Sequence, residues 1–203
     1  PEDASETTRS EKTICPAGYY CVGGEKHPCP AGSLGEAEGQ RNPTCDGQCP
    51  RGYYCVGGEK FECGSVDKYC PAGSSAPTNV TTGHYSGPSD VNENVRYEET
   101  LCPVGYYCVG GEKFECASGY FGNSTGLTTS QCSGMCKDGY YCESGSTRDD
   151  QHECGSVDKY CPAGSETPLV VPDGYYSGPE DASETTRSEK TICPAGYYCV
   201  GGE

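Results

Sequence analysis

Tryptophan is absent from this chain of 203 residues, which has only one methionine, three phenylalanines and three histidines. About half of the residues counted as hydrophobic are cysteine or tyrosine, so the aliphatic side chains that fill a conventional core are few. No stretch approaches the roughly 18 consecutive apolar residues of a membrane-spanning helix. The sequence therefore predicts neither a large apolar core nor a membrane span in this segment.

Basic residues are also in short supply, because 14 lysines and arginines stand against 30 aspartates and glutamates, for a net charge of −16. A nucleic-acid partner is excluded, since binding to phosphates needs a basic surface. Acidic pairs such as Glu2–Asp3 and Asp149–Asp150 suggest calcium, but the sequence has no D-x-D-x-D-G loop. We expect a solvated acidic face, calcium as a weak partner at most, and no metal site.

Catalytic motifs are missing as well. The sequence has no H-E-x-x-H, and His27, His84 and His152 lie at unmatched positions of the repeats described below. Gly-Gly pairs such as Gly23–Gly24 and Gly57–Gly58 are interpreted as turn glycines, because no helix follows them to bind phosphate. We expect no enzyme activity and no cofactor.

Cysteine, in contrast, is abundant, with 18 residues. Zinc sites use closely spaced pairs such as C-x2-C, whereas the tightest spacings here are Cys45-x3-Cys49 and Cys132-x3-Cys136. Disulfides persist in oxidising compartments and replace the core of small secreted units. We therefore predict a disulfide-stapled extracellular protein, either secreted or at the cell surface.

The sequence repeats itself at two levels. Residues 1–25 recur without change at 179–203, a shift of 178 residues. Inside this period, the gaps between cysteines run 5, 7, 15, 3, 5, 7, 6, 31 from Cys15 and 5, 7, 15, 3, 5, 11, 6, 31 from Cys102. Because neither end has the atypical sequence of a capping repeat, we expect an excerpt of a longer array, continuing with KHPCPAGS after Glu203. The alternative is a chain cut at convenient points.

The repeating unit is a module of four cysteines that opens with CPxGYYC or, once, CKDGYYC. The predicted divisions are 1–14 (the end of a preceding loop), 15–48, 49–101, 102–135, 136–192 and 193–203 (the start of the next period). The second and fourth modules end in long loops, 71–101 and 162–192, which share Tyr-Ser-Gly-Pro and are expected to bridge successive modules.

Four cysteines allow three pairings in each module. We favour first-to-third with second-to-fourth, such as Cys15–Cys29 with Cys21–Cys45, because crossed loops clamp a short chain more fully. The rival joins first to second and third to fourth, and only the rival gives a bond between Cys193 and Cys199. The cysteines predicted to form disulfides are Cys15, Cys21, Cys29, Cys45, Cys49, Cys55, Cys63, Cys70, Cys102, Cys108, Cys116, Cys132, Cys136, Cys142, Cys154 and Cys161.

Glycine (30 residues) and proline (15) interrupt the chain every few residues, which favours turns over helices. Gly-Tyr-Tyr-Cys-Val segments, as at 18–22 and 52–56, predict short strands. The predicted fold is a small disulfide-rich repeat array, mostly irregular with short β-hairpins, forming an elongated rod with essentially no helix.

Two kinds of surface residue remain as candidate sites. Asn79 and Asn123 open N-x-[ST] sequons, so covalent glycans are expected there. Paired tyrosines should send their two rings to opposite faces of a strand, one over the disulfides and the other free to pack on a neighbour. These candidate packing residues are Tyr19, Tyr20, Tyr53, Tyr54, Tyr106, Tyr107, Tyr140, Tyr141, Tyr197 and Tyr198.

The phrases CPAGYYCVGGEKHPCPAGS and CASGYFGNSTGLTTSQC resemble the ephrin-receptor-like cysteine-rich repeat over Cys15–Cys70 and Cys102–Cys161, whereas the long loops depart from it. The resemblance implies an extracellular, elongated, disulfide-rich rod without catalytic residues. Near-identity between periods further predicts a structural protein that associates with itself in an extracellular filament, appendage or coat. The alternative is a stalk or ligand-binding ectodomain of a receptor or adhesion protein, whose repeats should diverge.

Overall fold

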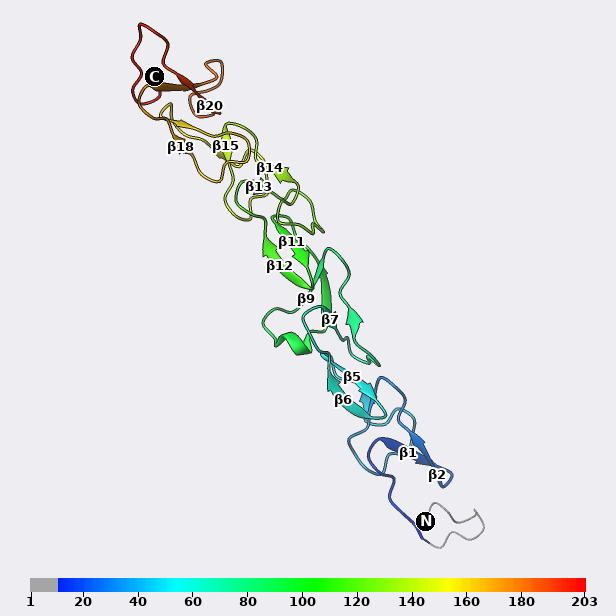
Figure 1. The fold of residues 1–203 in the computed structure, drawn as a ribbon. Coiled ribbons are helices and arrows are strands. Elements are labelled where there is room, and N and C mark those ends of the chain that lie inside the picture. The colour runs from blue at the N-terminus through cyan, green and yellow to red at the C-terminus, as the bar shows by residue number, and fades with distance from the viewer. Residues whose placement is uncertain (1–10) are drawn as a thin grey trace. The chain divides into compact units, whose positions relative to one another are not determined.

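The structure is a computed structural model that describes residues 11–203. Its regular elements are short strands of two or four residues and one 3-10 turn, joined by irregular segments (Figure 1). In chain order they are β1 (Tyr19–Val22), β2 (Glu25–Pro28), β3 (Ser33–Leu34), β4 (Gly47–Gln48), β5 (Tyr53–Val56), β6 (Glu59–Glu62), β7 (Lys68–Tyr69), β8 (Thr78–Asn79), β9 (His84–Gly87), the 3-10 turn η2 (Glu93–Val95), β10 (Glu98–Leu101), β11 (Tyr106–Val109), β12 (Glu112–Glu115), β13 (Tyr120–Phe121), β14 (Gly134–Met135), β15 (Tyr140–Tyr141), β16 (His152–Glu153), β17 (Lys159–Tyr160), β18 (Leu169–Val170), β19 (Tyr175–Gly178) and β20 (Glu189–Ile192).

Every strand pairs with one other strand, so the described residues form ten separate two-stranded sheets. The predicted array of short, disulfide-stapled hairpins is therefore confirmed, and η2 is the one helical turn in the described part of the chain. No helix among residues 11–203 has the length and apolar character needed to cross a membrane.

The turn glycines are also confirmed. Val22 pairs with Glu25 across Gly23 and Gly24, whose φ angles are 60° and 86°. Positive φ at both central residues is the requirement of a type I′ turn, which matches the twist of a hairpin and which glycine adopts most readily. The same geometry recurs at the β5–β6 and β11–β12 turns.

The chain divides into two compact units. One comprises residues 11–79 and 86–98 of the described chain, and the other residues 80–85 and 99–203. The first contains four disulfides and the second five. Each unit is therefore cross-linked within itself.

All 18 cysteines lie among the described residues, and none of them is free. The crossed pairing favoured above is wrong, because bonds join first to second and third to fourth cysteine in every module. The pairs are Cys15–Cys21, Cys29–Cys45, Cys49–Cys55, Cys63–Cys70, Cys102–Cys108, Cys116–Cys132, Cys136–Cys142, Cys154–Cys161 and Cys193–Cys199. Cys193 and Cys199, which the crossed pattern left unpaired, are bonded to each other.

The physical reason for the correction is the turn inside CPxGYYC. It reverses the chain directly after Cys15 and brings the Cα of Cys21 back to 5.8 Å from the Cα of Cys15, within the usual range for a disulfide. Cys29 follows β2 at the open end of the hairpin, where the segment returning through Cys45 reaches it with a Cα separation of 6.1 Å.

Sulfur replaces the missing apolar core. Fifteen of the 18 cysteines are buried, and Val171 is the one buried apolar side chain of another kind among residues 11–203. Each disulfide typically stabilises a small domain by about 2–4 kcal/mol. The side chains that are buried are therefore nearly all the ones that form the cross-links.

The two long loops are ordered in the same way. β9 pairs with β10 in the first, and β19 pairs with β20 in the second, with the shared Tyr-Ser-Gly in the leading strand each time. The serine of each segment, Ser86 or Ser177, is buried. The sequence similarity between the loops thus corresponds to a common hairpin.

The pairing gives a direct chemical prediction. Proteolysis of the oxidised chain without reduction should release peptides that link Cys29 to Cys45 and Cys63 to Cys70, as identified by mass spectrometry. Recovery of a peptide that links Cys15 to Cys29 would contradict the arrangement.

Candidate functional site: glycine junctions and hairpin faces

A tight turn precedes the leading strand of most hairpins. In Pro16-Ala17-Gly18-Tyr19 the N–H of Tyr19 donates to the carbonyl of Pro16 (3.2 Å), and Gly18 has a φ of 83°. A φ near +80° at the third position is the mark of a type II turn, where glycine is strongly preferred. The corresponding turns before β5, β11, β13 and β15 close with the same backbone bond.

In five such turns the glycine also forms hydrogen bonds with the backbone of a disulfide in the segment that follows. The N–H of Gly119 donates to the carbonyl of Cys142 (2.8 Å), and the carbonyl of Gly119 accepts from the N–H of Cys136 (2.9 Å). Because Cys136 and Cys142 are bonded to each other, one glycine holds the backbone on both sides of one disulfide. We call this two-bond arrangement a glycine clamp.

Glycine clamps recur along both units. Five disulfides are held at both cysteines, by Gly32 on Cys49–Cys55, Gly52 on Cys63–Cys70, Gly119 on Cys136–Cys142, Gly139 on Cys154–Cys161 and Gly174 on Cys193–Cys199. All ten bonds involve backbone atoms only. The joint between successive disulfides is therefore largely independent of the side chains around it.

A second backbone contact reinforces the joint at the next hairpin turn. The N–H of Gly35 donates to the carbonyl of Gly58 (2.9 Å), and the N–H of Ser177 donates to Gly202 in the same way (2.9 Å). Leu34, which precedes Gly35, forms an isolated parallel bridge with Gly58. Tyr176, which precedes Ser177, forms the same kind of bridge with Gly202.

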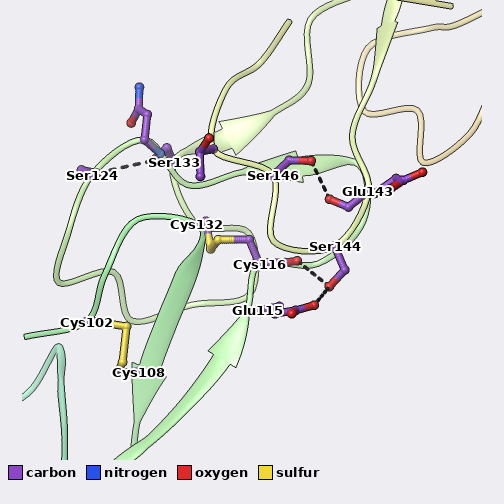
Figure 2. Close-up of a disulfide and its surroundings, with 12 residues drawn as sticks. Cys102, Cys108, Glu115, Cys116, Ser124, Cys132, Ser133, Glu143, Ser144 and Ser146 are labelled. Atoms are coloured by element: carbon purple, nitrogen blue, oxygen red, sulfur yellow. Dashed lines mark hydrogen bonds between the residues drawn. A yellow bond between two sulfur atoms is a disulfide. The ribbon is translucent and has the colours of Figure 1, made fainter. Parts of the chain in front are cut away.

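The inserted segment of the fourth module preserves this contact without a Gly-Gly turn. The N–H of Gly122 donates to the carbonyl of Ser146 (2.9 Å). The hydroxyl of Ser144 lies 2.8 Å from Glu115 Oε2 and 3.2 Å from the carbonyl of Cys116 (Figure 2). The insertion therefore folds back onto the preceding module and does not project from it.

Close approach explains why the clamp residue is glycine. A Cβ added to Gly52 would lie 2.5 Å from the carbonyl oxygen of Val95, and one added to Gly119 would overlap the carbonyl oxygen of Gly164. Neither obstacle is the end of a flexible side chain. A side chain at these positions would push successive segments apart.

The tyrosine pairs form two kinds of contact on the hairpins. In the four complete modules the second tyrosine of the pair stacks on the ring directly across the hairpin, as Tyr54 does on Phe61 (5.4 Å between centroids). The first tyrosine lies under a cation, as Tyr53 does under the Lys60 ammonium (5.4 Å). The tyrosine pairs in the four complete modules are half-buried, while Tyr197 and Tyr198 are exposed. The second tyrosines are thus partnered within their own hairpins, and their packing role stays a prediction.

The other predicted positions are dispersed. Asn79 is exposed in β8 and accepts from Lys68 Nζ (3.3 Å), whereas Asn123 is exposed in a loop whose backbone N–H donates to Ser133 Oγ (3.1 Å). His27 and His152 stack on tyrosine rings of their hairpins, and the Nδ1 atom of His84 in β9 lies 3.3 Å from the carbonyl oxygen of Thr82. The structure does not bring these residues together.

Acidic groups form no ion-binding cluster in the described chain. No group of three or more His, Cys, Asp or Glu side chains among residues 11–203 is placed to hold a metal ion. Asp149 and Asp150 lie in the inserted segment, where Asp150 pairs with Arg148 (3.1 Å), while Glu2–Asp3 lies outside the described residues. The Ser65 hydroxyl donates to Asp67 and, with the Lys68 ammonium, lowers the pKa of that carboxyl.

Comparison with family models and with curated proteins finds no match for this chain. What the site can do therefore follows from its geometry. It offers a backbone joint that recurs at five of the nine disulfides, and hairpins with exposed apolar side chains.

The glycine clamp predicts unequal effects for two similar substitutions. Gly110→Ala meets nothing within 4 Å and carries only the cost of positive φ, about 1–2 kcal/mol. Gly119→Ala adds overlap with a backbone carbonyl and should destabilise by about 3 kcal/mol or more. Urea unfolding of the two oxidised variants measures the difference, and equal losses would contradict the clamp.

Proposed function

We propose that this chain is part of a structural repeat protein that builds an extracellular filament, appendage or surface coat. The observation that carries the proposal is the identity of residues 1–25 with 179–203. When each period presents the same surface, contacts to a neighbour recur at a fixed step, and contacts that recur at a fixed step generate an open polymer. This function requires no catalytic residue, and we propose that the chain is not an enzyme.

The glycine clamps support a mechanical role. A module joined to the next by backbone hydrogen bonds and flanked by disulfides can be copied many times with the same geometry, whatever its surface residues are. Chains of this kind gain stability from contacts between neighbouring units and not from one central core.

An oxidising exterior is part of the same proposal. Nine disulfides in 203 residues would be reduced in a cytosol, whereas they persist outside cells. We also propose that the modules belong to the ephrin-receptor-like cysteine-rich repeats, on the strength of the CPAGYYCVGGEKHPCPAGS phrase and the four-cysteine spacing.

Imaging tests the filament directly. Native material, or an oxidised array of several periods, should appear by electron microscopy as regular polymers whose helical repeat corresponds to the 178-residue period or to its half. Monodisperse single chains at every concentration would overturn the proposal.

Glycans on Asn79 and Asn123 form a separate prediction. Both asparagines are exposed, so protein secreted from a glycosylating cell should lose mass at both sites on treatment with an amidase that releases N-linked glycans. Asn79→Gln and Asn123→Gln should each remove one of two mass steps, while Asn42→Gln, whose Pro43 blocks the sequon, should remove none. An unmodified wild-type chain from such a cell would contradict this prediction.

A further inference from the structure

The second unit carries a continuous strip of aromatic and aliphatic side chains around one lysine. Tyr160 and Leu169 are directly opposite each other in β17–β18, and Tyr175 and Ile192 are opposite in β19–β20. Opposite residues of an antiparallel pair lie on the same face of the sheet. Lys190 joins the two hairpins, because its ammonium lies 5.4 Å from the Tyr160 ring centre and 5.3 Å from that of Tyr175. We call these five residues the lysine strip.

The strip is open to solvent. Leu169 is 44% exposed and Ile192 is 68% exposed. The position equivalent to Ile192 is Leu101, which is followed by a complete module and is still 47% exposed. Among residues 11–203 Lys190 makes no ion pair, so its charge lies between two rings without a carboxylate.

The lysine strip occurs once in the 178-residue period. Each strip residue has a counterpart 91 residues earlier, in the first half of the period. In the order Tyr160, Leu169, Tyr175, Lys190 and Ile192, the counterparts are Tyr69, Thr78, His84, Glu99 and Leu101. The aliphatic residue of β18 is thus replaced by threonine, next to the sequon at Asn79, and the lysine is replaced by glutamate. The strip therefore distinguishes one half of the period from the other.

Two other hairpins present a matching face of opposite charge. On β5–β6, Val56 lies opposite Glu59 and Tyr54 lies opposite Phe61, so these four side chains share one face. Val56 is 51% exposed and Phe61 is 41% exposed. β11–β12 repeats the face with Val109, Glu112, Tyr107 and Phe114, and neither Glu59 nor Glu112 makes an ion pair within the described chain. We call these the glutamate faces.

We propose that the lysine strip of one chain docks on a glutamate face of a second copy of the same chain. Apolar side chains surround a single charge on each surface, and the two charges have opposite sign. Association would cover exposed valine, phenylalanine, leucine and isoleucine and would give Lys190 the carboxylate that it lacks in its own chain.

This contact joins two different surfaces, so it is heterologous and extends to an open chain of copies. The inference rests on the proposed filament and names its contact. Like-to-like docking of two lysine strips is disfavoured, because it would bring two ammonium groups together. Each face is small, so a single contact is weak, and repetition along an array would multiply its strength.

Charge exchange tests the contact. The oxidised 203-residue chain should show a weight-average mass that rises with concentration, up to about 1 mM, in sedimentation equilibrium. Lys190→Glu alone and the double variant Glu59→Lys/Glu112→Lys alone should each abolish this rise. An equimolar mixture of the two variants should restore it, because each strip then meets a face of opposite charge.

Matched controls separate the contact from general charge and stability effects. Lys159→Glu makes the same charge change in the β17–β18 hairpin, opposite Val170 and away from the strip, and should associate like the wild type. Val170→Ser, at a residue that is 70% exposed, should also have no effect, whereas Leu169→Ser/Ile192→Ser should abolish association.

The outcomes distinguish this inference from the filament itself. A wild-type chain that associates while the charge variants associate equally well, or a mixture that fails to recover, overturns the docking contact and leaves the filament standing. A wild-type chain that stays monomeric, together with an absence of polymers from arrays of several periods, overturns both.

Discussion

The hydrogen bonds between a glycine and the two backbones of a disulfide determine how this chain is organised. The chain has almost no aliphatic interior, and its buried apolar atoms are nearly all sulfur and the carbons attached to it. A disulfide restricts the unfolded chain locally, but it does not by itself place one loop relative to the next. The glycine clamp supplies that placement, because Gly119 and its equivalents bond to both ends of a disulfide belonging to the segment that follows.

A joint made of backbone atoms leaves the hairpin surfaces free to vary. The aromatic residue opposite the second tyrosine is histidine at 27 and 152 and phenylalanine at 61 and 114, yet the four stacks have similar geometry. The fourth module replaces a two-glycine turn by an inserted loop, and the carbonyl of Ser146 in that loop still accepts from the N–H of Gly122. Variation between modules is therefore concentrated in surface features, which is where the lysine strip and the glutamate faces differ in charge.

Much of the fold could be predicted from residue types and spacing. Gly57–Gly58 between Val56 and Glu59 identifies a two-residue turn, and that turn alone fixes the register that sets Tyr54 against Phe61. The stacks follow from that register, whereas the alternation along the strand predicts one ring of each pair over the disulfides and the other free to pack on a neighbour. The glycine before the leading tyrosine of each CPxGYYC phrase marks a turn but does not by itself identify a clamp, because the N–H groups of Gly18 and Gly105 in these phrases donate to Gly35 and Gly122 and not to a cysteine. The pairing of cysteines could not be settled this way, because spacing alone does not tell how far the turn after Cys15 brings the chain back.

Hydrogen exchange at the clamp amides tests the central claim most directly. In the oxidised chain, the N–H groups of Gly119, Gly139, Cys136 and Cys154 are all engaged in clamps and should exchange far more slowly than those of the exposed segment around Ser124 and Thr125. Replacing Cys136 and Cys142 by serine should release the Gly119 and Cys136 amides first, while the clamp on Cys154–Cys161 stays protected. Exchange of the clamp amides at the rate of the exposed segment, with all disulfides intact, would contradict the account.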